Sequence, residues 1–254
     1  MSLTVDEVLA VIIKAGAIML QSGAETYRVE DTVVRLGLAL GMVRVEPFAM
    51  PTGLVITLED ANGFTRTEVF RIMKRETNLH KVVMINDLSR QVSQGQLDYR
   101  QVVDRIKEVE RSGELYPKSL YLLAAGVGSG AFAILFKAGL LEFCVATVAG
   151  WVVHGVLALL RKKSLNQFII AFSGGAISAG MALLSQWIFP QINFDPVITG
   201  AIMTLVPGVA ITNAIRDVIN EDLISGGSRG LDAFLTAMGV AGGAAIVMGT
   251  VLVK

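Results

Sequence analysis

Cysteine and histidine are scarce in this chain. It has one cysteine, Cys144, and two histidines, His80 and His154, in 254 residues. A single cysteine excludes an intramolecular disulfide and any metal site built from several thiolates. Neither histidine has a companion at metal-ligand spacing, so we predict no metal site. We also expect no cofactor.

The chain also lacks a net charge. Its 22 basic and 22 acidic residues balance, and the two kinds are interleaved. Nucleic-acid binding needs a concentrated basic face, so we expect no nucleic-acid partner. The first residues, Met1 to Asp6, show no basic flank followed by an apolar run, which argues against a cleavable signal peptide.

The charges that are present are unevenly distributed. Residues 1–118 hold 31 of the 44 charged side chains, and residues 119–254 hold only 13. A mean hydropathy of +0.59 with 53% hydrophobic residues is high for a soluble protein. We therefore predict a cytoplasmic domain over residues 1–118 and a transmembrane domain over residues 119–254, divided near Pro117.

The cytoplasmic domain is predicted to be α+β. Apolar residues recur at helical spacing over residues 4–21. Ser22 and Glu25 have the spacing of a capping box that would start a second helix, and Gly41 would end it. Segments rich in β-branched and aromatic residues predict strands at 43–49, 54–59 and 64–70, with a hairpin turn at 60–63. Two more helices are predicted at 79–94 and, after a cap at Asp98, 99–112.

The transmembrane domain is predicted to be an all-α polytopic bundle. Each of its long apolar runs is near the ~20 residues that cross a bilayer. Five spans are predicted, at about 119–136, 139–160, 168–189, 196–213 and 231–253. Small residues four apart predict close helix packing in three of them: Gly126 with Gly130, Gly174 with Ser178, and Gly239 with Gly243.

The basic residues predict the orientation. They cluster before the first span, at residues 161–163 after the second, and at Arg216 and Arg229 between the last two. All three clusters fall on one side, so the positive-inside rule places the N-terminus in the cytoplasm and the C-terminal Lys254 outside. The predicted location is the inner (plasma) membrane of a bacterium.

The end of the fourth predicted span holds the strongest candidate site. Pro207 removes a backbone donor from the helix, and a freed carbonyl at membrane depth needs protein, water or a substrate as its partner. If the helix continues, Asn213 and Asp217 share one face of it, and Thr212 and Arg216 share another. The candidate substrate-binding residues are Pro207, Gly208, Thr212, Asn213, Arg216 and Asp217.

These residues have two interpretations. In the first, Arg216 holds the carboxylate of a small metabolite and Asp217 holds an ammonium group. In the second, Arg216 and Asp217 are interfacial charges just outside the lipid.

His154 lies within the second predicted span. A histidine there can bind an anion or relay protons, so it is a candidate proton relay. It can equally be hydrogen-bonded to a neighbouring helix with no other role.

The segment from Ser22 to Asp31 contains Ser, Glu, Arg and Asp in close order, which would suit a hydrolase. The capping box accounts for Ser22 and Glu25, and no histidine lies nearby in sequence to serve as a base. We therefore expect no catalytic residues.

Several motifs together resemble the threonine/serine exporter (ThrE-like) family. They are Ser22-Gly23-Ala24-Glu25-Thr26 with Val29-Glu30-Asp31, Pro51-Thr52-Gly53, Asn78-Leu79, Asn86-Asp87-Leu88, and Pro207-Gly208 through Thr212-Asn213-Ala214-Ile215-Arg216-Asp217 to Ser225-Gly226. The chain has one cytoplasmic domain and one five-span half, which is similar to the split, YjjP-type members. In those members the second half is a separate small membrane protein.

The resemblance implies proton-linked export of a small carboxylate-bearing metabolite, either threonine or serine or a dicarboxylate such as succinate. It also implies membrane lipid and a second five-span subunit as partners, and a homo-oligomer stays open. Two alternatives remain: a membrane-anchored hydrolase that uses the Ser22 to Asp31 segment, and a sensor or assembly subunit that transports nothing itself.

Overall fold

The computed structural model describes residues 3–113, 116–163 and 165–252. Over these residues the chain is mostly helical and contains one three-stranded sheet. It divides into two compact units. The first unit joins Met1–Leu115 to Val209–Gly230, and the second joins Tyr116–Gly208 to Leu231–Lys254.

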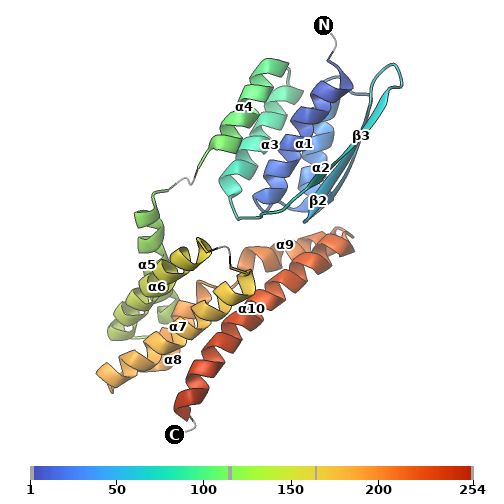
Figure 1. Cartoon of the computed structure of the whole chain (residues 1–254). Helices are drawn as coiled ribbons and strands as arrows, with labels where there is room; N and C mark the ends of the chain where they lie inside the picture. The colour runs from blue at the N-terminus through green and yellow to red at the C-terminus, as the bar shows by residue number, and fades with distance from the viewer. Residues whose placement is uncertain (1–2, 114–115, 164, 253–254) are drawn as a thin grey trace. The chain divides into compact units, whose positions relative to one another are not determined.

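The N-terminal part of the first unit has three layers. Strands β1, β2 and β3 form an antiparallel sheet in that order. Helices α1 and α2 pack on the sheet, and α3 and α4 pack on α1 from the other side (Figure 1). The bounds are α1 Val5–Gln21, α2 Thr26–Ala39, β1 Arg44–Met50, β2 Gly53–Glu59, β3 Thr65–Arg71, α3 Leu79–Ser93 and α4 Tyr99–Arg111.

Helix α1 forms the centre of this core. Most of its residues are buried, because it is covered by the sheet on one side and by α3 and α4 on the other. On β2 the alternate residues Leu54, Ile56 and Leu58 are fully buried, as expected for the inner face of a central strand. At Gly16 an added Cβ would lie 2.5 Å from Leu54 Cδ2, so this glycine allows α1 to approach the sheet closely.

Most of the predicted elements of residues 3–113 are confirmed to within one or two residues. The Asp98 capping box is present, and Gly41 follows α2 with φ +95°. The hairpin is stabilised by Asp60, whose side chain accepts hydrogen bonds from the backbone of Asn62 and Phe64.

The predicted capping box of Ser22 and Glu25 is wrong. Ser22 is instead the C-cap residue of α1, Gly23 continues the turn with φ +83°, and Glu25 precedes α2 without capping it. Helix α2 therefore begins at Thr26, which frees the Glu25 carboxylate for a partner elsewhere in the chain.

Three helices of the second unit match the first three predicted spans. They are α5 Lys118–Leu135, α6 Leu140–Arg161 and α7 Gln167–Ile188, each long and apolar enough to cross a membrane. Large apolar side chains lie on their outer surfaces; Leu140 and Trp187 are about 80% exposed. Such a surface suits lipid better than water.

The fourth predicted span is not one helix. Helix α8 covers Phe194–Met203, α9 covers Gly208–Ile219, and the chain is interrupted between them. Pro207 has no N–H and its ring clashes with the preceding turn, so the helix restarts only after it. Within the part of the chain that the structure describes, four helices are long and apolar enough to cross a membrane, or five if the broken pair counts as one.

The last helix, α10, covers Leu223–Leu252 and starts eight residues earlier than predicted. The Asp222 side chain accepts a hydrogen bond from the Ser225 backbone, which stabilises its first turn. Residues 253 and 254, where the prediction ends this span and places the outer terminus, lie outside the described residues.

The close packing predicted for the glycines of α5 and α10 is confirmed. A Cβ at Gly126 would lie 2.1 Å from the Trp151 ring, and one at Gly243 would lie 1.9 Å from the Phe172 carbonyl oxygen. Helix α5 therefore approaches α6, and α10 approaches α7, at distances that only glycine permits.

Candidate functional site

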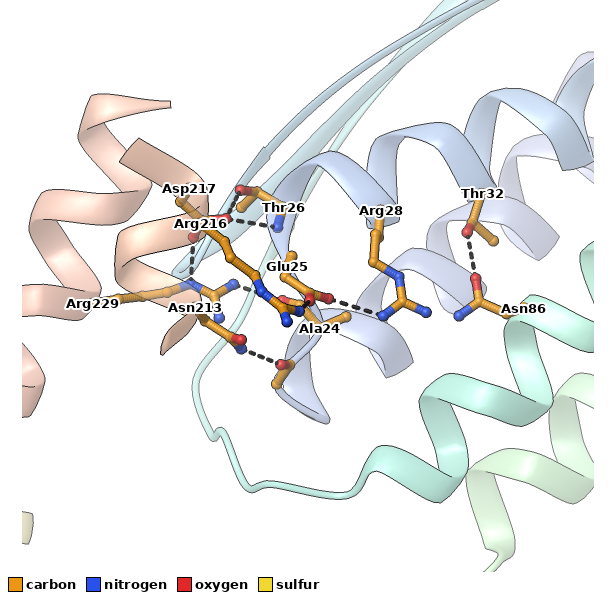
Figure 2. A network of polar contacts seen from close by, with 11 residues as sticks. Ala24, Glu25, Thr26, Arg28, Thr32, Asn86, Asn213, Arg216, Asp217 and Arg229 are labelled. Atoms are coloured by element: carbon orange, nitrogen blue, oxygen red, sulfur yellow. Dashed lines mark hydrogen bonds and ion pairs between the residues drawn. The ribbon is translucent and has the colours of Figure 1, made fainter. Parts of the chain in front are cut away.

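A polar cluster in the first unit joins α9 and the start of α10 to the turn before α2 (Figure 2). Its side chains come from segments about 190 residues apart in sequence. We call it the Arg216 cluster, and its members are Glu25, Thr26, Asn213, Arg216, Asp217 and Arg229.

Asp217 is the buried centre of the cluster, with no exposed surface. Its Oδ1 accepts hydrogen bonds from the Thr26 hydroxyl at 2.9 Å and from the Thr26 backbone at 3.4 Å. Its Oδ2 lies 3.0 Å from Nε of Arg229, which is 8% exposed and also donates to the Ala24 carbonyl at 2.7 Å. The Nε–Oδ2 contact is close, but it lacks the angle of a hydrogen bond. Asp217 and Arg229 thus form a buried ion pair. The hydrogen bonds from Thr26 to Asp217 and from Arg229 to the Ala24 carbonyl hold the two side chains in place.

Arg229 reaches Asp217 because α9 and α10 approach each other closely. At Gly226 an added Cβ would lie 2.4 Å from Val218 Cγ2 and 2.9 Å from the Ala214 carbonyl oxygen. Glycine at this position therefore brings the first turns of α10 against α9, one turn before Arg229.

Glu25 is held between two guanidinium groups. Its Oε1 lies 2.6 Å from Arg216 NH1, and its Oε2 lies 3.1 Å from Arg28 NH1. The Glu25 side chain is 6% exposed, whereas that of Arg216 is 54% exposed. One end of the cluster is thus a carboxylate bound by an arginine that still faces solvent.

Burial acts to raise the pKa of Glu25, but its own backbone N–H, the hydrogen bonds from Arg216 and Arg28 and the charge of Arg28 outweigh burial and lower the pKa. Because the pKa is lowered, the contact contributes its full stabilisation at pH values above the ordinary pKa of glutamate. It is lost only as the pH falls through the lowered value. Glu25 is therefore ionised at neutral pH.

Asn213 fixes the turn between α1 and α2. Its Nδ2 donates to the Gly23 carbonyl at 2.8 Å. Gly23 has φ +83°, a backbone conformation that residues other than glycine adopt only at a cost. In this conformation its carbonyl accepts the hydrogen bond from α9.

The structure brings together three of the six predicted substrate-binding residues. Asn213 and Asp217 share the buried face of α9, and Arg216 lies next to them on a more exposed face. Thr212 is exposed. Pro207 lies in the break between α8 and α9, Gly208 is the first residue of α9, and both belong to the second unit.

Sequence reasoning missed Arg229, Glu25 and Thr26 as members of this cluster. The sequence predicts Arg229 only as a basic residue of a loop, although it lies in an apolar segment where an unpaired charge is costly. The cost of an unpaired charge there is the one feature of the sequence that indicates a partner for Arg229. Nothing in the spacing of Glu25 indicates a partner 191 positions away.

His154 lies in the second unit and is 7% exposed. Its Nε2 is 2.9 Å from the Thr204 hydroxyl, and its Nδ1 is 3.3 Å from the Tyr121 hydroxyl. Thr204 donates its own proton to the Ala201 carbonyl, so its oxygen accepts from Nε2. The Nδ1 of a neutral ring then accepts from Tyr121.

Several apolar helices long enough to cross a bilayer define an integral membrane protein. The chain belongs to the ThrE family, whose model is described as "Putative threonine/serine exporter" and matches residues 10–251.

Two relatives carry the name "Probable succinate transporter subunit YjjP". The one from Klebsiella aerogenes is 28% identical over 243 residues, which cover 93% of this chain and 91% of that protein. The one from Escherichia coli strain K12 is 28% identical over 224 residues, which cover 85% and 84%. No solved structure matches the chain. These findings support a subunit of a membrane exporter.

Proposed function

We propose that this chain is one subunit of a secondary exporter that moves a small carboxylate-bearing metabolite out of the cytoplasm. The metabolite is threonine, serine or a dicarboxylate such as succinate, and Arg216 binds its carboxylate. The names of the family and of the relatives support both kinds of substrate.

The ion pair between Arg216 and Glu25 carries this proposal. A half-exposed guanidinium that binds a carboxylate at 2.6 Å has the geometry required for a substrate carboxylate. Glu25 occupies that position here, so a substrate would replace it.

The surrounding contacts give the other residues supporting roles. Asp217 is fully buried and its oxygens face Thr26 and Arg229, so in this conformation it does not reach a substrate ammonium group. We assign Asp217 and Asn213 to positioning, since they anchor α9 to the turn that presents Glu25.

We further propose that the N-terminal domain is cytoplasmic and that a separate five-span subunit completes the transport path. Residues 209–230 pack in the same unit as the N-terminal domain, which supports placing both on one side of the membrane. The word "subunit" in the relatives' name supports a partner. Exporters commonly form their path between two such repeats.

Replacing Arg216 tests the proposed binding role. In cells that also carry the five-span partner, Arg216→Lys should lower export of threonine or succinate about ten-fold at matched membrane abundance. Lysine keeps the charge but loses the planar fork that binds both carboxylate oxygens, and one charge-assisted hydrogen bond accounts for a factor of this size.

The matched control is Arg105→Lys, because Arg105 pairs with Glu108 at 2.9 Å on the exposed face of α4. This variant should export normally. Equal export by Arg216→Lys and Arg105→Lys would favour interfacial anchoring, in which either cation is adequate. Absence of export even by the wild-type chain with its partner would favour the sensor or assembly alternative. The hydrolase alternative is weakened by Ser22, which is 2% exposed and thus poorly placed as a nucleophile.

The proposed orientation can be tested with single cysteines, since Cys144 is the chain's one native cysteine. In a Cys144→Ala background, cysteines at the exposed positions Lys118, Lys162 and Asn220 should react with a membrane-impermeant maleimide only after permeabilisation. A cysteine at position 254 should react in intact cells. Labelling of position 162 in intact cells would overturn this orientation.

A further inference from the structure

The second unit contains a small polar cavity, separate from the Arg216 cluster. Its volume is about 90 Å³, several times the roughly 10–15 Å³ that one water needs. Its polar lining comes from α5, α6, α7, the end of α8 and α10, and consists of Tyr121, His154, Arg161, Gln167, Thr204 and Thr236.

Polar groups in a membrane-spanning bundle are costly and usually mark a ligand path. His154 and Thr236 are 7% and 8% exposed, so neither is a surface residue. Thr204 is the C-cap of α8, at the interrupted segment. Interrupted helices in membrane transporters are tolerated where they line such a cavity.

The hydrogen bonds of the two threonines define what the buried part of the cavity can accept. Thr204 donates to the Ala201 carbonyl at 2.9 Å, and Thr236 donates to the Asp232 carbonyl at 2.9 Å. Each hydroxyl donates its proton to a carbonyl of its own helix, so toward a ligand it can only accept hydrogen bonds. The last carbonyls of α8 add the negative end of a helix dipole. These groups suit a ligand that supplies hydrogen-bond donors.

The rim of the cavity has the opposite character. Arg161 is exposed at the end of α6, and Gln167 is exposed as the first residue of α7, where the helix dipole is positive. Arg161 and the N-terminal end of α7 suit an anionic group.

We propose that this cavity is a second, membrane-embedded binding site of the exporter. It takes a small molecule that carries both an anionic group, bound by Arg161, and a hydrogen-bond donor, bound by Thr204 and Thr236. His154 positions Thr204 through their 2.9 Å contact and is itself oriented by Tyr121. The proposal rests on the proposed export function and narrows it, because the ligand of this cavity is an exported amino acid such as threonine or serine.

Thr236→Val tests the site, because valine keeps the shape of threonine and removes the hydroxyl. Thr147→Val is the matched control: Thr147 is also 8% exposed and also donates to a carbonyl four residues back, but it does not line the cavity. Binding of L-threonine and of succinate is measured by calorimetry on the full chain in nanodiscs. Thr236→Val should weaken L-threonine binding about ten-fold, and Thr147→Val should leave it within about two-fold. Succinate has no donor at neutral pH, so its binding should not change.

Tyr121→Phe gives a second test that does not depend on how a buried site folds, because Tyr121 is 50% exposed. It should also weaken L-threonine binding through the loss of His154 orientation. If Thr236→Val and Tyr121→Phe bind like Thr147→Val while Arg216→Lys still lowers export, the cavity assignment is wrong and the proposed function stands. If the wild-type chain with its partner exports neither compound, the proposed function is wrong, and the cavity proposal that rests on it is wrong as well.

Discussion

Arg229→Ala should destabilise the first unit by about 3–5 kcal/mol, the cost of leaving a buried charge without its partner. Asp217 would keep its hydrogen bonds from Thr26, but its Oδ2 would lose the guanidinium 3.0 Å away in a site with no exposed surface. The Ala24 carbonyl would also lose its donor. We expect a lower melting temperature in detergent, faster proteolysis of the N-terminal domain and reduced membrane abundance.

Two comparisons separate this effect from a general loss of charge. Arg105→Ala removes an exposed ion pair and should cost no more than about 1 kcal/mol. The double variant Arg229→Met with Asp217→Leu removes both charges, and its stability should lie much closer to wild type, because no unpaired charge remains. A melting temperature of Arg229→Ala equal to that of Arg105→Ala would contradict the buried pair.

The elements that could be predicted from the sequence are those fixed by local chemistry. The Asp98 cap and the turn at Asp60 depend on contacts between residues at most four apart. The apolar runs of α5, α6 and α7 are set by composition alone. In each case the physical cause lies within the segment itself, so the pattern was sufficient.

The Ser22–Glu25 turn shows where local reasoning fails. A capping box was reasonable from the spacing, but it requires Glu25 to turn back on its own helix. Arg216 and Arg28 together offer that carboxylate a stronger electrostatic partner than one backbone N–H. The competing residue is 191 positions away, and no local pattern records it.

The fourth predicted span differs from the structure for another reason. The apolar run from 196 to 213 predicts one helix, although Pro207 lacks a backbone donor, and the structure has two helices there. The loss of one donor together with the steric clash of the ring is enough to end α8 before Pro207 and to let α9 join the first unit. The sequence also predicts a loop where α10 begins, so it does not place Arg229 on a helix beside α9.

Exchanging the charges of Glu25 and Arg216 should restore stability without restoring export. Each single variant, Glu25→Arg or Arg216→Glu, places like charges 2.6 Å apart in the present geometry and should lower both stability and export. Because an arginine at position 25 would also face Arg28, the exchange is made in an Arg28→Ala background. That background removes a partly exposed pair, which should cost no more than about 1 kcal/mol.

In the exchanged chain the ion pair is re-formed with the opposite polarity, so the melting temperature should return close to that of Arg28→Ala. Export should stay at least about ten-fold lower, because the guanidinium now projects from the turn before α2 and no longer stands on α9 to receive a substrate carboxylate. Stability and export are measured on the same preparations at matched abundance. Recovery of both would mean that Arg216 acts only as the partner of Glu25, and the carboxylate-binding role would have to be assigned elsewhere in the chain.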